Sequence, residues 1–133
     1  EKSIAASALR GLCEVAKVDH LIYKFKAYSV LFGLVADDPS VNVTHNECRL
    51  GRWYYAGEGQ ACFSKLPGFR EIDSPHADVH RYAKEALRAH AEQDAERMLS
   101  NVVGMEAASL KVLSGLDRMV SSAELDSGLL CSH

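Results

Sequence analysis

The spacing of apolar residues most constrains the fold of this chain, because no segment alternates apolar and polar residues for long enough to predict a strand. Apolar residues instead recur at steps of three and four over long segments, which is the period of a helix with one buried face. Only 3 of the 133 residues are Pro, so these segments are rarely interrupted. The pattern predicts an all-α protein: an antiparallel four-helix bundle with a short irregular or helical insertion between helices two and three.

The first two helices are predicted over residues 2–34 and 44–57. The first rests on one long apolar series: Ile4, Ala8, Leu9, Leu12, Val15, Ala16, Ile22, Phe25 and Leu31. The second has Thr44 as its expected cap, with Glu47 three residues later as in a capping box, and ends at Gly57.

The other two helices are predicted to begin near Ser74 and Asp94. Ser74 is a good cap and Pro75 is tolerated at the first helical position. One stripe of this third helix carries His76, Val79, His80, Ala83 and Leu87. The fourth helix extends to Ser121 and carries Met98, Val102, Met105, Leu110, Leu113, Leu116 and Val120. Before the third helix an apolar plug is expected from Phe63, Leu66, Phe69 and Ile72.

Composition and charge indicate one ordinary domain over residues 1–133, with its core in about residues 2–121 and a flexible tail over 122–133. The net charge is −3 and the two signs are interspersed, which disfavours nucleic acid as a partner. Before Asp37 the longest uncharged stretch is ten residues, short of the roughly 20 that span a bilayer, so no direct membrane insertion is expected.

The chain shows no secretory signal, and its four cysteines are widely spaced without a CxxC motif. These features predict a cytoplasmic protein with free or metal-bound thiols. Because the chain starts at Glu1 rather than Met, we expect a fragment or a processed product.

The strongest local motif is the pair His76 and His80. Histidines four residues apart lie on one face of a helix, one turn from each other, which suits two ligands of one metal ion. By itself the pair fits two partly exposed helical histidines somewhat better than it fits a metal site. Ala77 stands where a zinc protease has its catalytic Glu, so the motif does not predict a hydrolase, and no enzyme activity is expected.

Cys48 and His20 are the candidate partners of this pair. Cys48 opens the second helix, and Gly51 inside that helix costs about 1 kcal/mol relative to Ala, so we expect close packing there. His20 lies on the buried stripe of the first helix. A buried Cys and a core His are the plainer interpretations of these residues. If facing helices bring them together, a tetrahedral Zn²⁺ site results, with the ligands His20, Cys48, His76 and His80.

Three blocks of the sequence resemble the chemoreceptor zinc-binding (CZB) domain family of bacterial sensory proteins. They are His20-Leu21-Ile22-Tyr23, then Cys48-Arg49-Leu50-Gly51-Arg52-Trp53, then His76 to His80 in the family's H-x-x-x-H pattern. The flanking residues resemble members at the cytoplasmic end of methyl-accepting chemotaxis receptors. The combination is specific, although one block alone is not.

The resemblance implies zinc held by His20, Cys48, His76 and His80, in a helical homodimer that regulates an attached chemotaxis signalling module. Family members respond to zinc or to oxidation of the zinc-bound Cys, here Cys48, by hypochlorous acid. His45, three residues before Cys48, is the rival of His20 as fourth ligand. A purely structural zinc domain that holds a dimer together is the alternative function. Asp19, Asp73 and Asp78 are candidates to hold the second nitrogen of a ligand imidazole.

Overall fold

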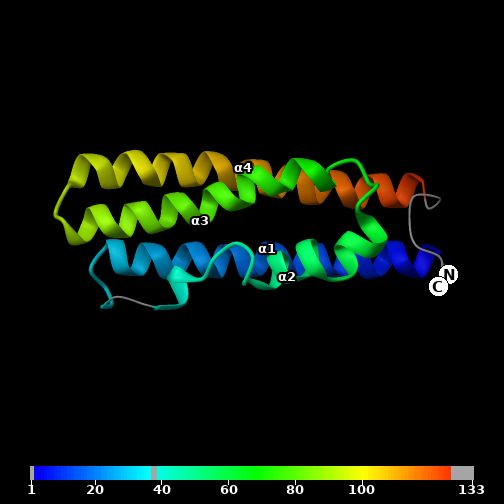
Figure 1. Ribbon diagram of the computed structural model, residues 1–133, viewed down its shortest axis with the longest axis horizontal. Coiled ribbons are helices and arrows are strands. Elements are labelled where there is room, and N and C mark those ends of the chain that lie inside the picture. Colours follow the sequence, from blue (N-terminus) through cyan, green and yellow to red (C-terminus); the bar gives the residue numbers. More distant parts are fainter. Residues whose placement is uncertain (1, 37–38, 127–133) are drawn as a thin grey trace.

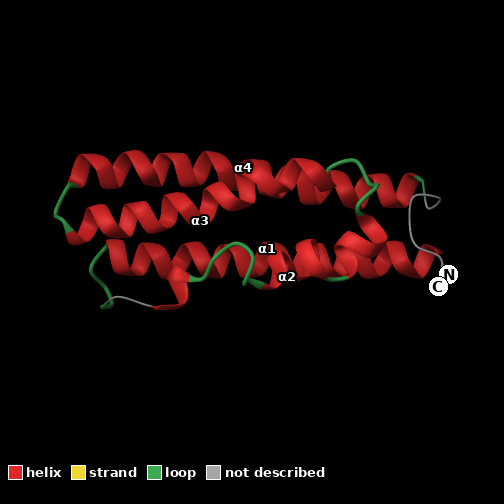
Figure 2. Ribbon diagram, in the orientation of Figure 1, coloured by secondary structure: helices red, strands yellow, loops and turns green. Residues whose placement is uncertain are grey.

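The computed structural model describes residues 2–36 and 39–126 of the chain. All regular secondary structure in these two ranges is helical, and no strand occurs in them (Figure 2). In chain order the elements are α1 (Lys2–Leu31), the 3-10 turn η1 (Pro39–Asn42), α2 (Arg49–Ala56), the π-helical η2 (Gly59–Phe63), α3 (Phe69–Ala91) and α4 (Ala95–Leu125). The all-α prediction is confirmed.

The long helices α1, α3 and α4 lie along one another (Figure 1). α3 and α4 form an antiparallel hairpin with a three-residue turn, in which Gln93 has a φ of 58°. α4 begins near Asp94 as predicted, and Asp94 caps it, because its carboxylate accepts a hydrogen bond from the N–H of Arg97 at 3.1 Å. α1 runs antiparallel to α4 and packs against both α3 and α4, and the short α2 lies against α1.

The core lies between these helices. Its fully buried side chains include Leu9, Cys13, Ile72, Val79, Met105, Val112, Leu116 and Met119. All four plug residues expected before the third helix are buried in this core. No described helix is both long and apolar enough to cross a membrane.

Two predicted helix starts are wrong. Thr44 and Glu47 share a hydrogen bond as expected, but they form a turn, and α2 begins only after Cys48, which is its cap. α3 begins at Phe69 rather than near Ser74, so Pro75 lies inside the helix. The early start follows from tertiary packing, because Phe69 stacks on Tyr54 of α2 and Ile72 is buried beside Gly115 of α4.

A glycine makes this early start of α3 possible. Gly68 caps α3 with a φ of 96°, and a Cβ there would lie 2.6 Å from the carbonyl oxygen of Gly115 on α4. Any other residue would therefore be both strained and in collision with α4. α4 itself continues to Leu125, four residues beyond its predicted end, while residues 127–133 of the expected tail lie outside the described part of the chain.

α1 carries two apolar faces, and only one of them is buried. Several residues of its predicted buried series are in fact exposed: Ile4, Ala8, Val15, Ile22 and Phe25. Leu110 on α4 is exposed as well. The three- and four-residue spacing cannot separate two neighbouring stripes on one helix, because both satisfy the same period.

The expectation of free thiols holds for two cysteines of the described chain. Cys13 is buried and free, and Cys48 is partly buried and free. Cys62 is disulfide-bonded, so the expectation is wrong for this residue. Sequence spacing says nothing about which thiols meet in space. Cys131 lies outside the described residues.

Candidate metal centre

Cys48 is positioned by its place at the start of α2. It has extended backbone geometry as the cap of the helix, and its Sγ accepts a hydrogen bond from the N–H of Gly51 at 3.4 Å. The thiol in turn donates to the carbonyl oxygen of His45 at 3.5 Å. Burial raises the pKa of the Cys48 thiol, so without a metal ion the group is protonated at neutral pH. A coordinated metal ion reverses this balance and deprotonates a thiol.

Gly51 allows the loop before α2 to approach the helix closely. A Cβ built at Gly51 would lie 1.8 Å from the carbonyl oxygen of His45. The close packing predicted at this glycine is therefore confirmed, and the group that packs there is the backbone of the loop leading into Cys48. This approach places the sulfur at the helix start.

His76 and His80 bring two imidazoles to the same place from one face of α3. Their ring centroids are 5.1 Å apart, and both residues are buried. Sγ of Cys48 lies 3.3 Å from Nε2 of His76. One ligand atom from each of Cys48, His76 and His80 lies within 4.8 Å of the others. These three residues form a group able to hold one metal ion.

The buried imidazoles are neutral at pH 7. Burial, followed by the neighbouring His80 and His45, lowers the pKa of His76 to about 3. Burial likewise lowers the pKa of His80 to about 4, against a hydrogen bond to Val43 that raises it. A metal ligand must be deprotonated, so these rings are in the form that binds a metal ion.

The tautomer of His80 follows from its hydrogen bond. Nδ1 of His80 lies 2.8 Å from the carbonyl oxygen of Val43, and since a carbonyl only accepts, Nδ1 carries the proton. Nε2 is then left with its lone pair for a metal ion. The ring of Tyr23 packs against His80 at 4.5 Å, and its hydroxyl donates to the carbonyl of Val41 at 2.9 Å. The loop before α2 thus orients a residue on α3.

His76 carries a sign of a missing partner. Its Nδ1 is buried without a hydrogen-bond partner. An unsatisfied buried polar atom costs about 1–3 kcal/mol and commonly marks the place of an ion or a water molecule. Nε2 of the same ring faces Sγ of Cys48, so the orphaned Nδ1 is the nitrogen left for a contact outside the metal ion. The donor set of one sulfur and two imidazole nitrogens itself fits a metal such as zinc.

His20 lines the same cavity but stands apart from the three clustered ligand atoms. The cavity has a volume of about 50 Å³, which suits an ion and a few small groups better than an organic substrate. Nε2 of His20 lies 2.6 Å from Oγ of Ser109 on α4. Burial lowers the pKa of His20 to about 4, so this ring is neutral as well.

His45 also lies near the cluster. Its ring centroid is 5.8 Å from that of His76 and 6.4 Å from that of His80, and its edge contacts Tyr55. The side chain is only partly buried and does not line the cavity that holds His20 and Cys48. Both candidates for the fourth ligand are therefore close, and both lie outside the group of three.

The carboxylates expected to hold the ligand imidazoles make other contacts. Asp19 pairs with Arg49 at 3.2 Å and Asp78 with Arg81 at 3.0 Å, while Asp73 accepts a hydrogen bond from the hydroxyl of Tyr55. The orienting groups that sequence reasoning missed are the Val43 carbonyl and the Ser109 hydroxyl. No sequence signal marks either group, because each contacts an imidazole on a different element: Val43 contacts His80, and Ser109 contacts His20.

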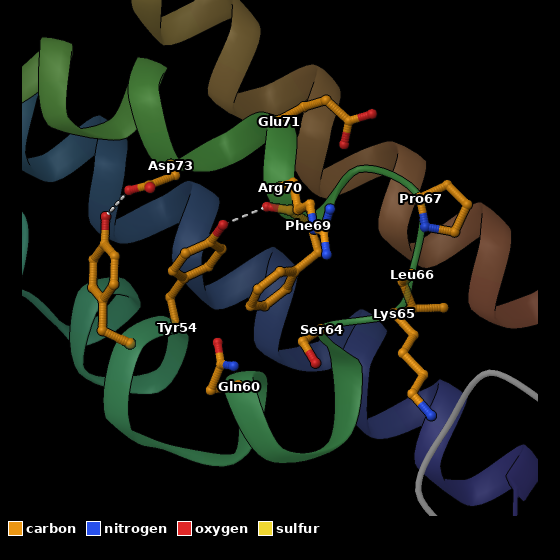
Figure 3. A pocket seen from close by; sticks show the side chains of 11 residues that line it. Tyr54, Gln60, Ser64, Lys65, Leu66, Pro67, Phe69, Arg70, Glu71 and Asp73 are labelled. Carbon is orange, nitrogen blue, oxygen red and sulfur yellow. Dashed lines mark hydrogen bonds between the residues drawn. The ribbon is translucent and has the colours of Figure 1, made fainter.

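A second cavity lies between α2, η2 and the start of α3 (Figure 3). Tyr54 stacks on Phe69 with ring centroids 4.1 Å apart, and its hydroxyl donates to the carbonyl of Phe69 at 2.7 Å. The cavity is larger, about 720 Å³, but none of the described residues lining it is a cysteine or a histidine. The chemistry of metal binding lies in the smaller cavity, and these aromatic contacts hold α2 against α3.

Comparison with known families agrees with this geometry. A family model described as the chemoreceptor zinc-binding domain, CZB, matches residues 20–87, just over half of the chain. The chain belongs to the CZB family. All four predicted ligands lie inside the matched region of this CZB domain, which begins at His20 and extends past His80. No curated protein and no solved structure matches the chain.

Membership in the family assigns a zinc-binding signalling role to this CZB domain, and CZB is a regulatory family rather than a known catalytic one. The metal-binding prediction is supported by the clustered Cys48, His76 and His80, and the identity of the metal as zinc comes from the family.

Proposed function

We propose that this CZB domain is the cytoplasmic zinc-binding sensory domain of a bacterial chemotaxis receptor, attached to or neighbouring a chemotaxis signalling module. In this proposal the chain is one domain, arranged as an antiparallel four-helix bundle, and His20, Cys48, His76 and His80 hold one Zn²⁺. The observation that carries it is the mutual approach, within 4.8 Å, of three ligand atoms from the partly buried Cys48 and the buried His76 and His80. The cytoplasmic location rests on the family, since the described cysteines divide between free and disulfide-bonded.

Zinc bound by these residues joins three helices through one ion. His20 lies on α1, Cys48 caps α2, and the two remaining ligands lie on α3. α2 has only eight residues, so it depends on tertiary contacts for its stability. Release of the ion frees the start of α2 and alters how it packs on α1, which is the element that transmits the signal.

Cys48 is the proposed redox switch. Hypochlorous acid converts its thiolate to a sulfenic acid and releases chloride: sulfur is oxidised, chlorine is reduced, and the hydroxyl group of the oxidant ends on sulfur. The modified sulfur is no longer an anionic ligand, so zinc is released. Cys48 is partly exposed, whereas Cys13 is fully buried and burial raises its pKa to about 12, which makes Cys13 unreactive.

A purely structural zinc site is the alternative. It predicts tight zinc and slow oxidation of Cys48, with no change in helix packing short of unfolding. The rate at which hypochlorous acid releases zinc from the loaded protein, followed with a zinc-sensitive dye, separates the two functions. Rapid release supports the sensory function, and release only on global unfolding supports the structural one.

The fourth ligand is tested by comparing His20→Ala with His45→Ala. We expect the protein prepared without chelator to contain about one zinc ion per chain, as a closed structural site does. His20→Ala is expected to weaken zinc binding by about 100-fold, because loss of a direct ligand exceeds the effect of an outer contact. Competition with a chromophoric chelator measures this affinity.

His45→Ala is the matched control, since the His45 ring also lies near the cluster, 5.8 Å from that of His76, and it should bind zinc as the wild type does. The opposite result, with zinc lost in His45→Ala and kept in His20→Ala, would make His45 the fourth ligand. A wild-type protein without stoichiometric zinc would contradict the proposed function as a whole.

We further propose that α1 pairs with a second copy of the chain through its exposed face. Val15, Val18, Ile22 and Phe25 follow steps of three, four and three, as at the contact positions of paired helices, and all are exposed. Ile4 and Phe32 extend this exposed stripe toward the two ends of α1. Such a long apolar row on a surface commonly marks an interface.

Ile22→Glu is expected to convert a dimer into a monomer at micromolar concentration, because it places a charge in the centre of the apolar row. Sedimentation velocity measures the change. Leu110→Glu is the matched control, since Leu110 is equally apolar and exposed but lies beside Glu71 and Pro75 of α3, away from α1. Dimerisation that survives Ile22→Glu would show that this face of α1 is not the interface.

A further inference from the structure

Ser109 is a buried hydroxyl aimed at a candidate zinc ligand. It lies on α4 and is 1% exposed. Its Oγ is 2.6 Å from Nε2 of His20 on α1. A buried hydroxyl requires a hydrogen-bond partner, and here that partner is an imidazole of the metal cavity. This contact brings α4 into a site whose four proposed ligands all lie elsewhere.

Neighbouring charges hold this hydroxyl in place. Nζ of Lys24 lies 3.3 Å from Oγ of Ser109 and donates to it. The same ammonium pairs with the carboxylate of Glu106 at 2.6 Å, and the hydroxyl of Tyr28 donates to that carboxylate too. Lys24 and Tyr28 come from α1, whereas Glu106 comes from α4. The network therefore fixes Ser109 relative to His20 from both helices.

His80 and His20 each have one ring nitrogen engaged by a hydrogen-bond partner, and the engaged nitrogen differs between the two rings. Nδ1 of His80 is fixed by the Val43 carbonyl, which leaves Nε2 for a metal ion. Nε2 of His20 is engaged by Ser109, which leaves Nδ1. Histidines that bind metals almost always use their second nitrogen for such a contact, because it fixes both the tautomer and the ring orientation.

We infer that Ser109 is a positioning residue for the zinc site: its Oγ accepts a hydrogen bond from Nε2–H of His20, so that His20 binds zinc through Nδ1. This inference rests on the proposed function, since it requires His20 to be a ligand. Its consequence is that zinc occupancy is linked to the contact between α1 and α4 as well as to the position of α2.

The nitrogen bound to zinc is read directly from long-range proton–nitrogen NMR of the ring nitrogens in the zinc-loaded wild type, with His20→Ala identifying the His20 signals. We expect His20 to be metal-bound at Nδ1 and protonated at Nε2, and His80 to show the reverse. Zinc bound to His20 through Nε2 would overturn the role of Ser109 and leave the proposed function intact. A loaded protein in which His20 carries no metal would overturn both the inference and the proposed ligand set.

Ser109→Ala tests the same inference through affinity. We expect zinc binding to weaken by about 10-fold, the lower end for loss of an outer contact, with unchanged helical content by circular dichroism. Ser114→Ala is the matched control, an exposed serine on the same helix, and it should bind zinc normally. The absorption bands of the cobalt-substituted protein should also change in Ser109→Ala and not in Ser114→Ala.

A double-mutant cycle distinguishes positioning from a general structural effect. Because Ser109 acts through His20, Ser109→Ala should cost no further zinc affinity in the His20→Ala background. An equal loss in both backgrounds, or wild-type affinity in Ser109→Ala itself, would overturn the inference. The NMR measurement on the wild type decides the matter independently if Ser109→Ala does not fold.

Discussion

Replacing Cys48 with Ser is expected to weaken zinc binding by about 1,000-fold, more than the loss of any one imidazole, because the thiolate is the only anionic ligand of the proposed set. Ser is itself a good helix cap, so α2 should still form. The variant therefore separates metal binding from folding of the helix. Chelator competition measures the affinity directly.

The same change should remove the stabilisation that zinc provides. A ligand at 100 times its dissociation constant stabilises the native state by about 2.7 kcal/mol, so the wild type should unfold at a higher temperature with zinc than with chelator. Cys48→Ser should show no such difference. Cys13→Ala is the control, since it removes the other free thiol of the described residues, which does not line the cavity, and it should keep the full zinc response. A zinc response that persists in Cys48→Ser would exclude Cys48 as a ligand.

Replacing Gly51 with Ala is expected to lower the free energy of unfolding by about 3 kcal/mol, the upper end for overpacking, because the new Cβ meets a backbone carbonyl and not a flexible side chain. The added atom would lie 1.8 Å from the oxygen of His45 and 2.8 Å from its carbonyl carbon. The loop before α2 must then move, and Cys48 moves with it. Zinc affinity should therefore fall together with stability, as denaturant unfolding and chelator competition will show.

Gly11→Ala is the matched control for this effect. Gly11 lies inside α1, and a Cβ there meets no atom within 4 Å. Replacement of a helical glycine by Ala stabilises by about 1 kcal/mol when nothing collides, so the two glycines should respond with opposite signs. A Gly51→Ala protein as stable as the wild type, with normal zinc affinity, would mean that the loop yields easily and does not position the thiol.

Much of the fold follows from local signals. The start of α4 at Asp94 is set by a side-chain cap, and the stripe with His76 and His80 follows the helical period, so both were predictable. The start of α3 was not, because Phe69 and Ile72 extend that helix toward its N-terminus only when α2 and α4 are present to bury them. The burial of these two side chains stabilises the longer helix, so Ser74, the expected cap, lies inside α3 instead.

In the candidate metal site, too, some features follow from local sequence and others only from contacts between elements. The approach of His76 to His80 is a property of one helix, and their placement near Cys48 agrees with the family pattern. Whether His20 or His45 completes the set, and which groups hold the rings, depends on contacts between elements. The carboxylates nearest in sequence, including Asp19 and Asp78, pair with arginines instead.

By itself, the sequence determined that this chain is all-helical, that it carries one thiol and several imidazoles in a CZB pattern, and that Gly51 marks a close approach. These are consequences of helical period and residue chemistry, which act over a few positions. Only the tertiary structure decided which of two apolar faces of α1 is buried, that a carbonyl of the loop and a serine of α4 orient His80 and His20, and that Cys48 caps α2. Those features depend on groups that are distant in sequence and meet only when the helices pack, so no local pattern encodes them.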